Sequence, residues 1–166
     1  MQNTDLSNNN SNAQKVRQFM EIFDQSLDCN IFDGRAATLR LLNLRVRLID
    51  EEVEELHNAV EEFGDWATSA TADPGERITA KRAAFVEMID ALTDLLYVTY
   101  GFFHAFGVEP DAAFDIVHRS NMSKLDDHGQ PIYREDGKVL KGPYYQPPDF
   151  TGLLREYLTA AGEPIS

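Results

Sequence analysis

The run Glu51-Glu52-Val53-Glu54-Glu55 contains the first residues whose types and spacing could do chemistry. Glu52 and Glu55 are three residues apart, so they share one face of a helix. That face is otherwise apolar, because Leu48 and Ala59 continue it at four-residue steps. A carboxylate on an apolar helix face meets another element of the fold, and it therefore needs a partner of opposite charge.

Three further acids, Glu87, Asp90 and Asp94, occur in a second apolar segment, residues 78–106. At about 100° per residue, they project within roughly 60° of one another on a helix. Carboxylates gathered between two packed helices repel one another and lose hydration, and a bound cation would offset both effects. Mg²⁺ and Mn²⁺ prefer oxygen ligands, and Mg²⁺ often completes its shell with water and substrate phosphates. The two acidic sets therefore predict a carboxylate-lined Mg²⁺ or Mn²⁺ site that faces an anionic substrate.

Other interpretations of these residues have less support. A Glu-rich helix is often a solvated face, but here the acids interrupt apolar stripes on two helices. A di-iron carboxylate bundle needs a Glu-x-x-His on two helices, and only Glu54 to His57 matches. The single cysteine, Cys29, has no sequence neighbour that would activate its thiol. A divalent-metal site accounts for both acidic sets.

Two long helices must position these acids. Residues 39–63 carry two neighbouring apolar stripes, and residues 78–106 carry two more. We expect the main buried stripe of the first helix to contain Leu39, Leu42, Val46, Ile49, Val53, Leu56, Val60 and Phe63. One stripe of the second helix contains Ile78, Phe85, Ile89, Leu92, Leu96, Thr99 and Phe103, and its neighbour contains Ala84, Met88, Ala91, Leu95, Val98 and Phe102.

Shorter helices and a loop arm complete the predicted fold. The apolar spacing indicates further helices over residues 16–27, 110–125 and 150–161. Gly64 marks the expected end of the first long helix, and Asp73, Pro74 and Glu76 form a strong start for the second. The predicted fold class is an all-α bundle of four to five helices with a long C-terminal loop arm.

The loop arm, residues 126–149, is rich in Gly, Pro, Asp and Tyr. Asp136-Gly137 lies between two β-prone runs, which favours a short hairpin with a type I′ turn. Four cations lie in or next to this segment of an otherwise acidic protein, namely Lys124, Arg134, Lys138 and Lys141. This local reversal of charge fits a phosphate-facing arm and a solvated loop equally well.

Length and composition limit the class of protein. The 166 residues suit a single domain, which we expect over residues 13–166, after a disordered Asn- and Ser-rich tail over residues 1–12. A net charge of −13 argues against polymeric nucleic acid as a partner. No apolar run reads as a membrane span, and the first residues lack the pattern of a signal or transit peptide. With one cysteine in the chain, we expect a cytoplasmic protein.

Taken together, the motifs resemble a known family. Glu51-Glu52-x-x-Glu55 followed by Glu87-x-x-Asp90 is similar to the signature of the all-α nucleoside triphosphate pyrophosphohydrolases, the MazG-like superfamily. The resemblance is stronger to the phosphoribosyl-ATP pyrophosphohydrolase-like branch, which is related to the dimeric dUTPases. It covers about residues 36–150 and includes the segments 94–101, 117–124, 136–138 and 147–149.

The resemblance implies a chemistry and roles for individual residues. Family members are all-α homodimers or homotetramers that hydrolyse a nucleoside triphosphate to the monophosphate and pyrophosphate with Mg²⁺ or Mn²⁺. Glu52 and Glu55 would be metal ligands, and Glu51 would be the catalytic residue that orients or deprotonates the attacking water. The implied substrate-binding residues are Arg119, Asn121, Lys124, Tyr133 and Lys138.

The second helix departs from the family pattern. In the usual motif the Glu-x-x-Asp directly precedes the Leu-Leu-Tyr segment, which begins here at Leu95. Asp94 would then be the aspartate, and Ala91 stands where a glutamate belongs. Asp94 with Asp90, or Glu87 with Asp90, would then provide the metal ligands on this helix, and the first pair is slightly favoured. All three acids are kept as candidate ligands.

The expected function is that of a metal-dependent pyrophosphohydrolase acting on a nucleoside triphosphate, with dUTP and non-standard nucleotides among the candidate substrates. A phosphoribosyl-ATP pyrophosphohydrolase is one alternative. A non-catalytic helical protein that binds nucleotide or metal and dimerises is the other. The expected partners are a small nucleotide and a second copy of the chain, and neither a nucleic acid polymer nor a membrane.

Overall fold

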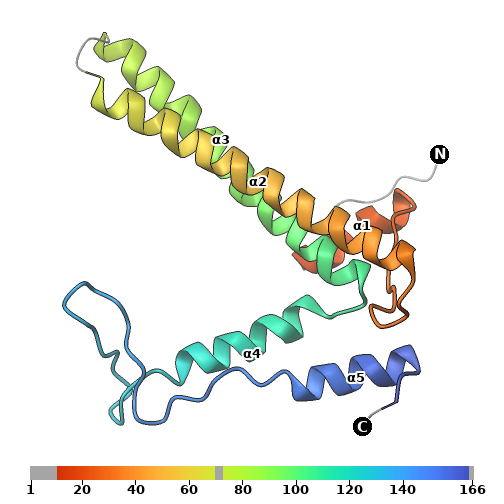
Figure 1. The fold of residues 1–166 in the computed structure, drawn as a ribbon. Coiled ribbons are helices and arrows are strands. Elements are labelled where there is room, and N and C mark those ends of the chain that lie inside the picture. Colours follow the sequence, from red (N-terminus) through yellow and green to blue (C-terminus); the bar gives the residue numbers. More distant parts are fainter. Residues whose placement is uncertain (1–10, 70–72, 165–166) are drawn as a thin grey trace. The chain divides into compact units, whose positions relative to one another are not determined.

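The computed structural model describes residues 11–69 and 73–164, and within them the chain forms five helices (Figure 1). The helices are α1 (Asn12–Ile22), α2 (Ala36–Thr68), α3 (Pro74–Ala105), α4 (Pro110–Met122) and α5 (Thr151–Ala161). The predicted all-α class is confirmed. The chain divides into two compact units, Met1–Phe106 and Gly107–Ser166. In the described part of the chain, none of the helices is both long and apolar enough to cross a membrane.

The described residues include only the end of the predicted N-terminal tail. Residues 1–10 of the tail lie outside the described residues. Ser11 caps α1 by accepting a hydrogen bond from the backbone N–H of Gln14, whose side chain accepts one in return from the N–H of Ser11. The expectation of one domain over residues 13–166 stays a prediction.

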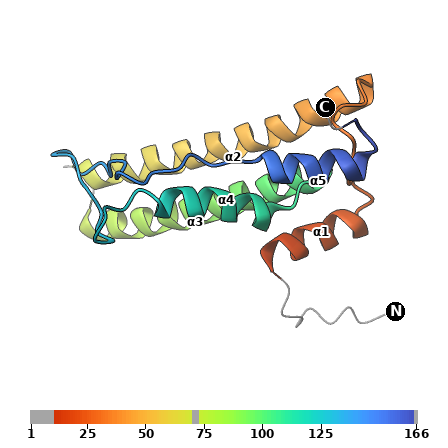
Figure 2. The same cartoon turned by 90° about the horizontal axis from the view of Figure 1, so that it is seen from below.

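In the first unit, α2 and α3 form a long antiparallel hairpin, and α1 packs against α3 (Figures 1 and 2). The register of the hairpin is visible at three levels. Arg45 lies against Gly101, Glu52 lies in the electrostatic field of Asp94, and Ala59 lines the same hollow as Glu87. Successive levels are seven residues apart on each helix, which is about two helical turns, or 10.5 Å.

The stripe predicted to be the main buried one on the first long helix is only partly buried, since three of its eight residues are exposed and the other five are half-buried. Leu39 and Val60 are 58% and 51% exposed, whereas Thr38, Arg45 and Ala59 are buried. On α3, the stripe that begins at Ile78 is exposed along most of its length. Its neighbour contains the buried Ala84 and Ala91 together with half-buried Met88, Leu95, Val98 and Phe102.

The physical reason for this difference is side-chain size. Two long helices approach most closely where the facing residues are small, and Ala84 and Ala91 on α3 provide such positions opposite α2. The spacing of apolar residues identifies both stripes, but it does not show which of the two is more deeply buried. The larger residues of the other stripes remain uncovered within the first unit.

Two helix ends differ from the prediction, and one start is confirmed. α2 continues through Gly64 to Thr68, because a glycine costs a helix only about 1 kcal/mol. α1 ends at Ile22, so Leu27 lies in the following loop. Asp73 caps α3 as predicted, since its side chain accepts hydrogen bonds from the N–H groups of Gly75 and Glu76.

The loop after α1 is fastened to the C-terminal end of α3. The backbone N–H groups of Asp28 and Cys29 donate to the carbonyl oxygens of His104 and Ala105, at 3.0 and 2.9 Å. The buried ring of His104 contacts the carbonyl oxygen of Ala13 through Nε2, at 2.8 Å. These contacts satisfy carbonyl groups that a helix end leaves free, so they fix α1 and its loop on α3.

In the second unit, the segment after the loop arm is tied to the end of α4. Ser120 donates its hydroxyl to the carbonyl oxygen of Gln146 at 2.8 Å, and the N–H of Gln146 donates to Ser123 at 2.9 Å. Gly142 donates to the carbonyl oxygen of Lys124. A Cβ at Gly142 would lie 2.1 Å from the carbonyl oxygen of Leu125, so only glycine fits this close approach.

The predicted hairpin in the loop arm is present as a single antiparallel bridge between Tyr133 and Val139. Its turn differs from the predicted type I′. That type needs positive φ at two successive residues, and here only Gly137 has one, at 82°. The N–H of Gly137 donates to the carbonyl oxygen of Arg134, and the N–H of Arg134 donates to that of Lys138. This pattern is a three-residue turn with the glycine in the left-handed position.

The ion pair between Arg17 and Asp28 yields a prediction about stability and pH. The guanidinium holds the pKa of Asp28 below its ordinary value of 3.8, mainly through the two hydrogen bonds at 3.1 and 2.6 Å. A lowered carboxyl pKa stabilises the fold above pH 3.8, and that contribution is lost as the pH falls through the lowered pKa. Because both side chains are partly exposed, Asp28→Asn should cost only about 0.5 kcal/mol at pH 7.

Thermal unfolding at several pH values tests this prediction. The deficit of Asp28→Asn should disappear in acid. Asp24→Asn is the matched control, because Asp24 also has a positive φ, 51° against 53° for Asp28. A deficit that persists below the pKa of Asp28, or an equal deficit in the control, would assign the effect to the backbone and not to the ion pair.

Candidate active site

Glu52 is at the centre of the acidic residues that the two long helices bring together. Its side chain is half-buried on the inner face of α2, and its Oε2 atom is buried without a hydrogen-bond partner. Burial raises the pKa of Glu52, and the negative charges of Glu55, Asp94, Glu51 and Asp90 raise it further, in that order. Acids predicted on two separate helices therefore lie close enough to repel one another.

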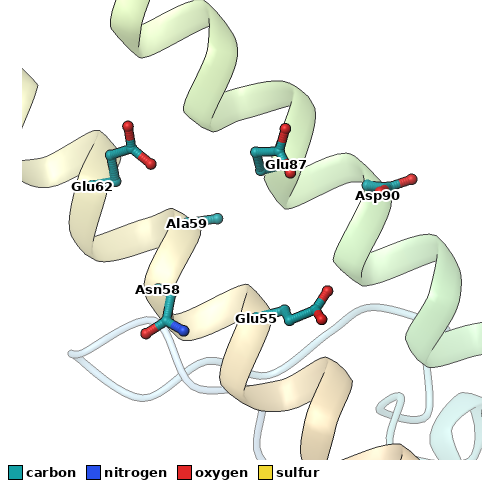
Figure 3. Close-up of a pocket in the computed structure, with 6 residues that line it drawn as sticks. All are labelled: Glu55, Asn58, Ala59, Glu62, Glu87 and Asp90. Atoms are coloured by element: carbon teal, nitrogen blue, oxygen red, sulfur yellow. The ribbon is translucent and has the colours of Figure 1, made fainter.

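A hollow of about 370 Å³ opens between α2 and α3 beside this cluster. It is lined by Glu55, Asn58, Ala59, Glu62, Glu87 and Asp90 (Figure 3). Glu55 extends from α2 toward α3, and Glu87 and Asp90 lie nearly one turn apart on α3 (Figure 3). The hollow is thus lined by carboxylates from both helices, as the spacing of the acids predicts.

Sequence reasoning missed Asn58 and Glu62 as residues of this hollow. They follow Glu55 by three and seven residues, so helix periodicity places all three on one face of α2. The same helix spacing is present in the sequence. It could have predicted that the polar face of α2 continues for about two turns beyond Glu55.

The donor set suits a hard divalent cation. Every acid around Glu52 offers carboxylate oxygens, and the buried Oε2 atom of Glu52 has an unused lone pair in a region of raised negative charge. Within the described residues, however, the side chains do not converge in groups of three or more on a point that could hold an ion. The neighbourhood of Glu52 and the hollow still contains all six predicted acids, namely Glu51, Glu52, Glu55, Glu87, Asp90 and Asp94. Their roles as catalytic residue and metal ligands stay predictions.

An aromatic group adjoins the acids and also escaped sequence reasoning. Tyr97 follows Asp94 by three residues on α3, and burial and then the charge of Asp94 raise its pKa. Its ring contacts Phe19 of α1 edge-on, with ring centres 5.6 Å apart. Phe19 in turn stacks on Phe23. Tyr97 therefore lies close to Asp94, and its ring packs against α1.

The five predicted substrate-binding residues all belong to the second unit. Lys124 donates from Nζ to Oδ1 of Asn121 at 2.7 Å, so these two side chains are already paired. Tyr133 forms the bridge of the loop arm, and Arg119 and Lys138 are exposed. Their cationic and amide groups are suited to phosphate oxygens, and this role stays a prediction.

Comparison with known proteins identifies the family. The phosphoribosyl-ATP pyrophosphohydrolase family matches residues 16–121, which span α1 to α4 and include every acid of the site. The chain belongs to the phosphoribosyl-ATP pyrophosphohydrolase family. The resemblance seen in the acidic motifs is thereby confirmed.

Two individual proteins resemble this member of the family. The uncharacterized protein L479 of Acanthamoeba polyphaga mimivirus is 28% identical over 147 residues, which are 85% of this chain and 47% of that protein. The chain therefore spans about half the length of this curated relative. A crystal structure of a "putative NTP pyrophosphohydrolase" from Exiguobacterium sp. 255-15 is 28% identical. The match covers 92% of this chain and 96% of that one, with a TM-score of 0.40.

The environment of Glu52 yields a prediction about the metal-free protein. A raised carboxyl pKa means that the folded state binds a proton more readily than the unfolded state does, so stability falls as the pH rises above 4.5, the ordinary value. In chelator at pH 7, Glu52→Gln should therefore melt at a higher temperature than the wild type. The difference should shrink as the pH falls through the raised pKa of Glu52 toward 4.5, because the folded wild-type side chain takes up its proton over this range.

Glu54→Gln is the matched control, because Glu54 is an exposed acid on the same helix and does not line the hollow. Its melting temperature in chelator should stay close to that of the wild type. Added Mn²⁺ should stabilise the wild type and the control more than Glu52→Gln. If Glu52→Gln melts below the wild type in chelator at pH 7, repulsion at Glu52 is not what strains the metal-free fold.

Proposed function

We propose that the protein is a metal-dependent nucleoside triphosphate pyrophosphohydrolase, which converts a (d)NTP to the monophosphate and pyrophosphate. The observation that carries this proposal is Glu52, whose buried, unpaired oxygen is surrounded by carboxylates from two helices. A fold does not retain so much like charge at a packed helix interface without a use for it. A divalent cation and a polyphosphate together supply that use.

The chain's own residues have distinct roles in the proposed reaction. Glu52 and Glu55 on α2, with Asp90, Asp94 and Glu87 on α3, would hold Mg²⁺ or Mn²⁺. When bound, such an ion neutralises charge on the phosphate oxygens and lowers the pKa of a coordinated water. The number of ions and the choice between the Asp90/Asp94 and Glu87/Asp90 pairs are left open.

Glu51 orients the attacking water and accepts its proton. The water oxygen forms a bond to the α-phosphorus, the bond from that phosphorus to the bridging oxygen breaks, and pyrophosphate leaves. Arg119, Asn121, Lys124, Tyr133 and Lys138 are proposed to hold the phosphate groups. Lys124 and Asn121 would act as one unit, because the lysine already orients the amide.

Phosphoribosyl-ATP is a second candidate substrate, favoured by the description of the matching family. Its hydrolysis breaks the same type of bond, so the acidic site serves either reaction. dUTP and non-standard nucleotides also remain candidates within the proposal. The non-catalytic alternative predicts binding of metal and nucleotide without product.

The exposed apolar faces support a homodimer or homotetramer. Phe85, Ile89, Leu92 and Leu96 form an apolar strip on α3 that the rest of the first unit leaves exposed, with Phe85 and Leu96 55% and 59% exposed. A strip of this kind on a long helix is typical of a helix-to-helix interface. We propose a second copy of the chain as a partner in a cytoplasmic enzyme.

Product analysis tests the proposed reaction. The purified protein is incubated with Mg²⁺ or Mn²⁺ and a panel of (d)NTPs, or with phosphoribosyl-ATP, and nucleotides and phosphate species are separated by chromatography. Monophosphate with pyrophosphate, lost in chelator, is expected from at least one nucleotide. Diphosphate with orthophosphate would contradict attack at the α-phosphorus.

Substitution of the acids tests their roles. Glu55→Gln and Asp94→Asn should each lower turnover more than about a hundredfold, because each removes a charged oxygen ligand. Both should remain folded and helical by circular dichroism. Glu54→Gln should keep wild-type turnover. Full activity in Glu55→Gln and Asp94→Asn would remove the metal-site hypothesis.

A further inference from the structure

A second hollow adjoins the acidic one along α2. It has a volume of about 510 Å³ and is lined by Asn58, Glu61, Glu62, Asp65, Trp66 and Ser69. Asn58 and Glu62 line both hollows. The two hollows therefore lie next to each other along α2, and the second one lies nearer to the end of the helix.

Trp66 gives the second hollow a flat aromatic wall. It is the only tryptophan of the chain, is half-buried, and follows Ala59 by seven residues, which is about 10.5 Å along the helix. This separation suits a nucleotide whose phosphates lie near Ala59 and whose base reaches Trp66. An indole ring stacks on nucleobases, and such contacts strengthen binding considerably.

The polar groups around Trp66 discriminate between bases. Glu61 and Asp65 offer carboxylate oxygens, which accept hydrogen bonds and donate none. Guanine presents two adjacent donors, its ring N1–H and its amino group, which match one carboxylate in a bidentate pair. Uracil presents one N–H between two carbonyl oxygens, and a carboxylate repels those oxygens. The hollow thus favours an amino-bearing base, and guanine fits best.

We propose that the hollow at Trp66 is the base subsite of this enzyme and selects a guanine nucleotide. The proposal rests on the proposed function, because it assumes that the phosphates of the nucleotide lie at the hollow of Glu55 and Glu87. Trp66 stacks on the base, Glu61 or Asp65 accepts its hydrogen bonds, and Asn58 lies between the base and the phosphates. The subsite lies on α2, beyond the acids of the family motif.

Fluorescence of Trp66 provides a direct test on the unmodified protein. The chain has one tryptophan, so its emission reports on this hollow alone. The protein is titrated in Mg²⁺ with the α,β-methylene analogues of GTP and UTP, which resist cleavage at the α-phosphorus, and with inorganic tripolyphosphate. The GTP analogue should quench Trp66 and bind at least about tenfold tighter than the UTP analogue. Tripolyphosphate should leave the emission unchanged.

Other outcomes of the titration would overturn the proposal. One is equal affinity for the two analogues. Another is binding of the GTP analogue by calorimetry without a change in Trp66 emission, because the base would then lie elsewhere, for example beside Tyr97. A third outcome comes from a parallel titration with spermidine. If spermidine quenches Trp66 and the GTP analogue does not, the hollow binds an organic cation, which a tryptophan among carboxylates also suits.

Variants separate stacking from hydrogen bonding. By calorimetry, Trp66→Leu should weaken the GTP analogue by roughly ten- to a hundredfold, and Trp66→Phe should retain most of the affinity. Glu61→Gln and Asp65→Asn test the acceptors, and at least one should lose the preference for guanine over uracil. Glu54→Gln, outside both hollows, should bind like the wild type. Unchanged affinity in Trp66→Leu would overturn the subsite.

The failure of this proposal is distinguishable from the failure of the proposed function. Turnover of several (d)NTPs with no preference for guanine, and no effect of Trp66→Leu on KM, would overturn the base subsite and leave the enzyme. Binding and quenching by the GTP analogue without product from GTP would overturn the enzyme and leave the nucleotide site. The two assays therefore test separate statements.

Discussion

Repulsion among the carboxylates between α2 and α3 is the constraint on which the rest of the structure depends. Glu52 is half-buried, its Oε2 atom is unpaired, and its pKa is raised first by burial and then by four neighbouring acids. Two helices that carry so much like charge would separate unless other contacts held them. The close approach at Ala84 and Ala91 and the packing of α1 on the end of α3 supply those contacts. The fold therefore keeps a strained site in place between well-packed regions.

Because facing residues of α2 and α3 recur every seven positions, the type of residue pair between the two helices changes from one level to the next. The level of Arg45 and Gly101 is a packed one, where the guanidinium occupies the space that a larger residue at 101 would need. The next level pairs Glu52 with Asp94, and the one beyond it pairs Ala59 with Glu87 beside the hollow. Because two helical turns separate the levels, a change at one level leaves the acids of the next in place. A packed level, an acidic level and a level that lines the hollow thus follow one another along the same two helices.

The sequence predicts the elements of this arrangement better than their contacts. Helix period and the Asp73 cap place α3 correctly, and the spacing of Glu52 and Asp94 predicts that both face the partner helix. The burial of the apolar stripes was predicted only in part, because the helix period marks a stripe as apolar without saying which one meets small residues on the opposite helix. The hollow at Trp66 was not predicted for a related reason. Its lining residues come from α2 and its C-cap Ser69, and only the structure shows that two of them also line the acidic hollow.

In our proposals, hydrolysis and base selection depend on different parts of α2. The family match covers residues 16–121, which include the acids of the candidate site and the whole of α2, so it does not by itself separate the two roles. Base selection needs groups that contact the base, and these lie where the chemistry places no demand. In our proposals the carboxylate of Glu55 binds a metal ion that faces a phosphate, whereas that of Asp65 accepts a hydrogen bond from the base. One acidic helix would then serve two purposes, since a carboxylate oxygen can bind a cation at one level and accept a hydrogen bond about three turns later.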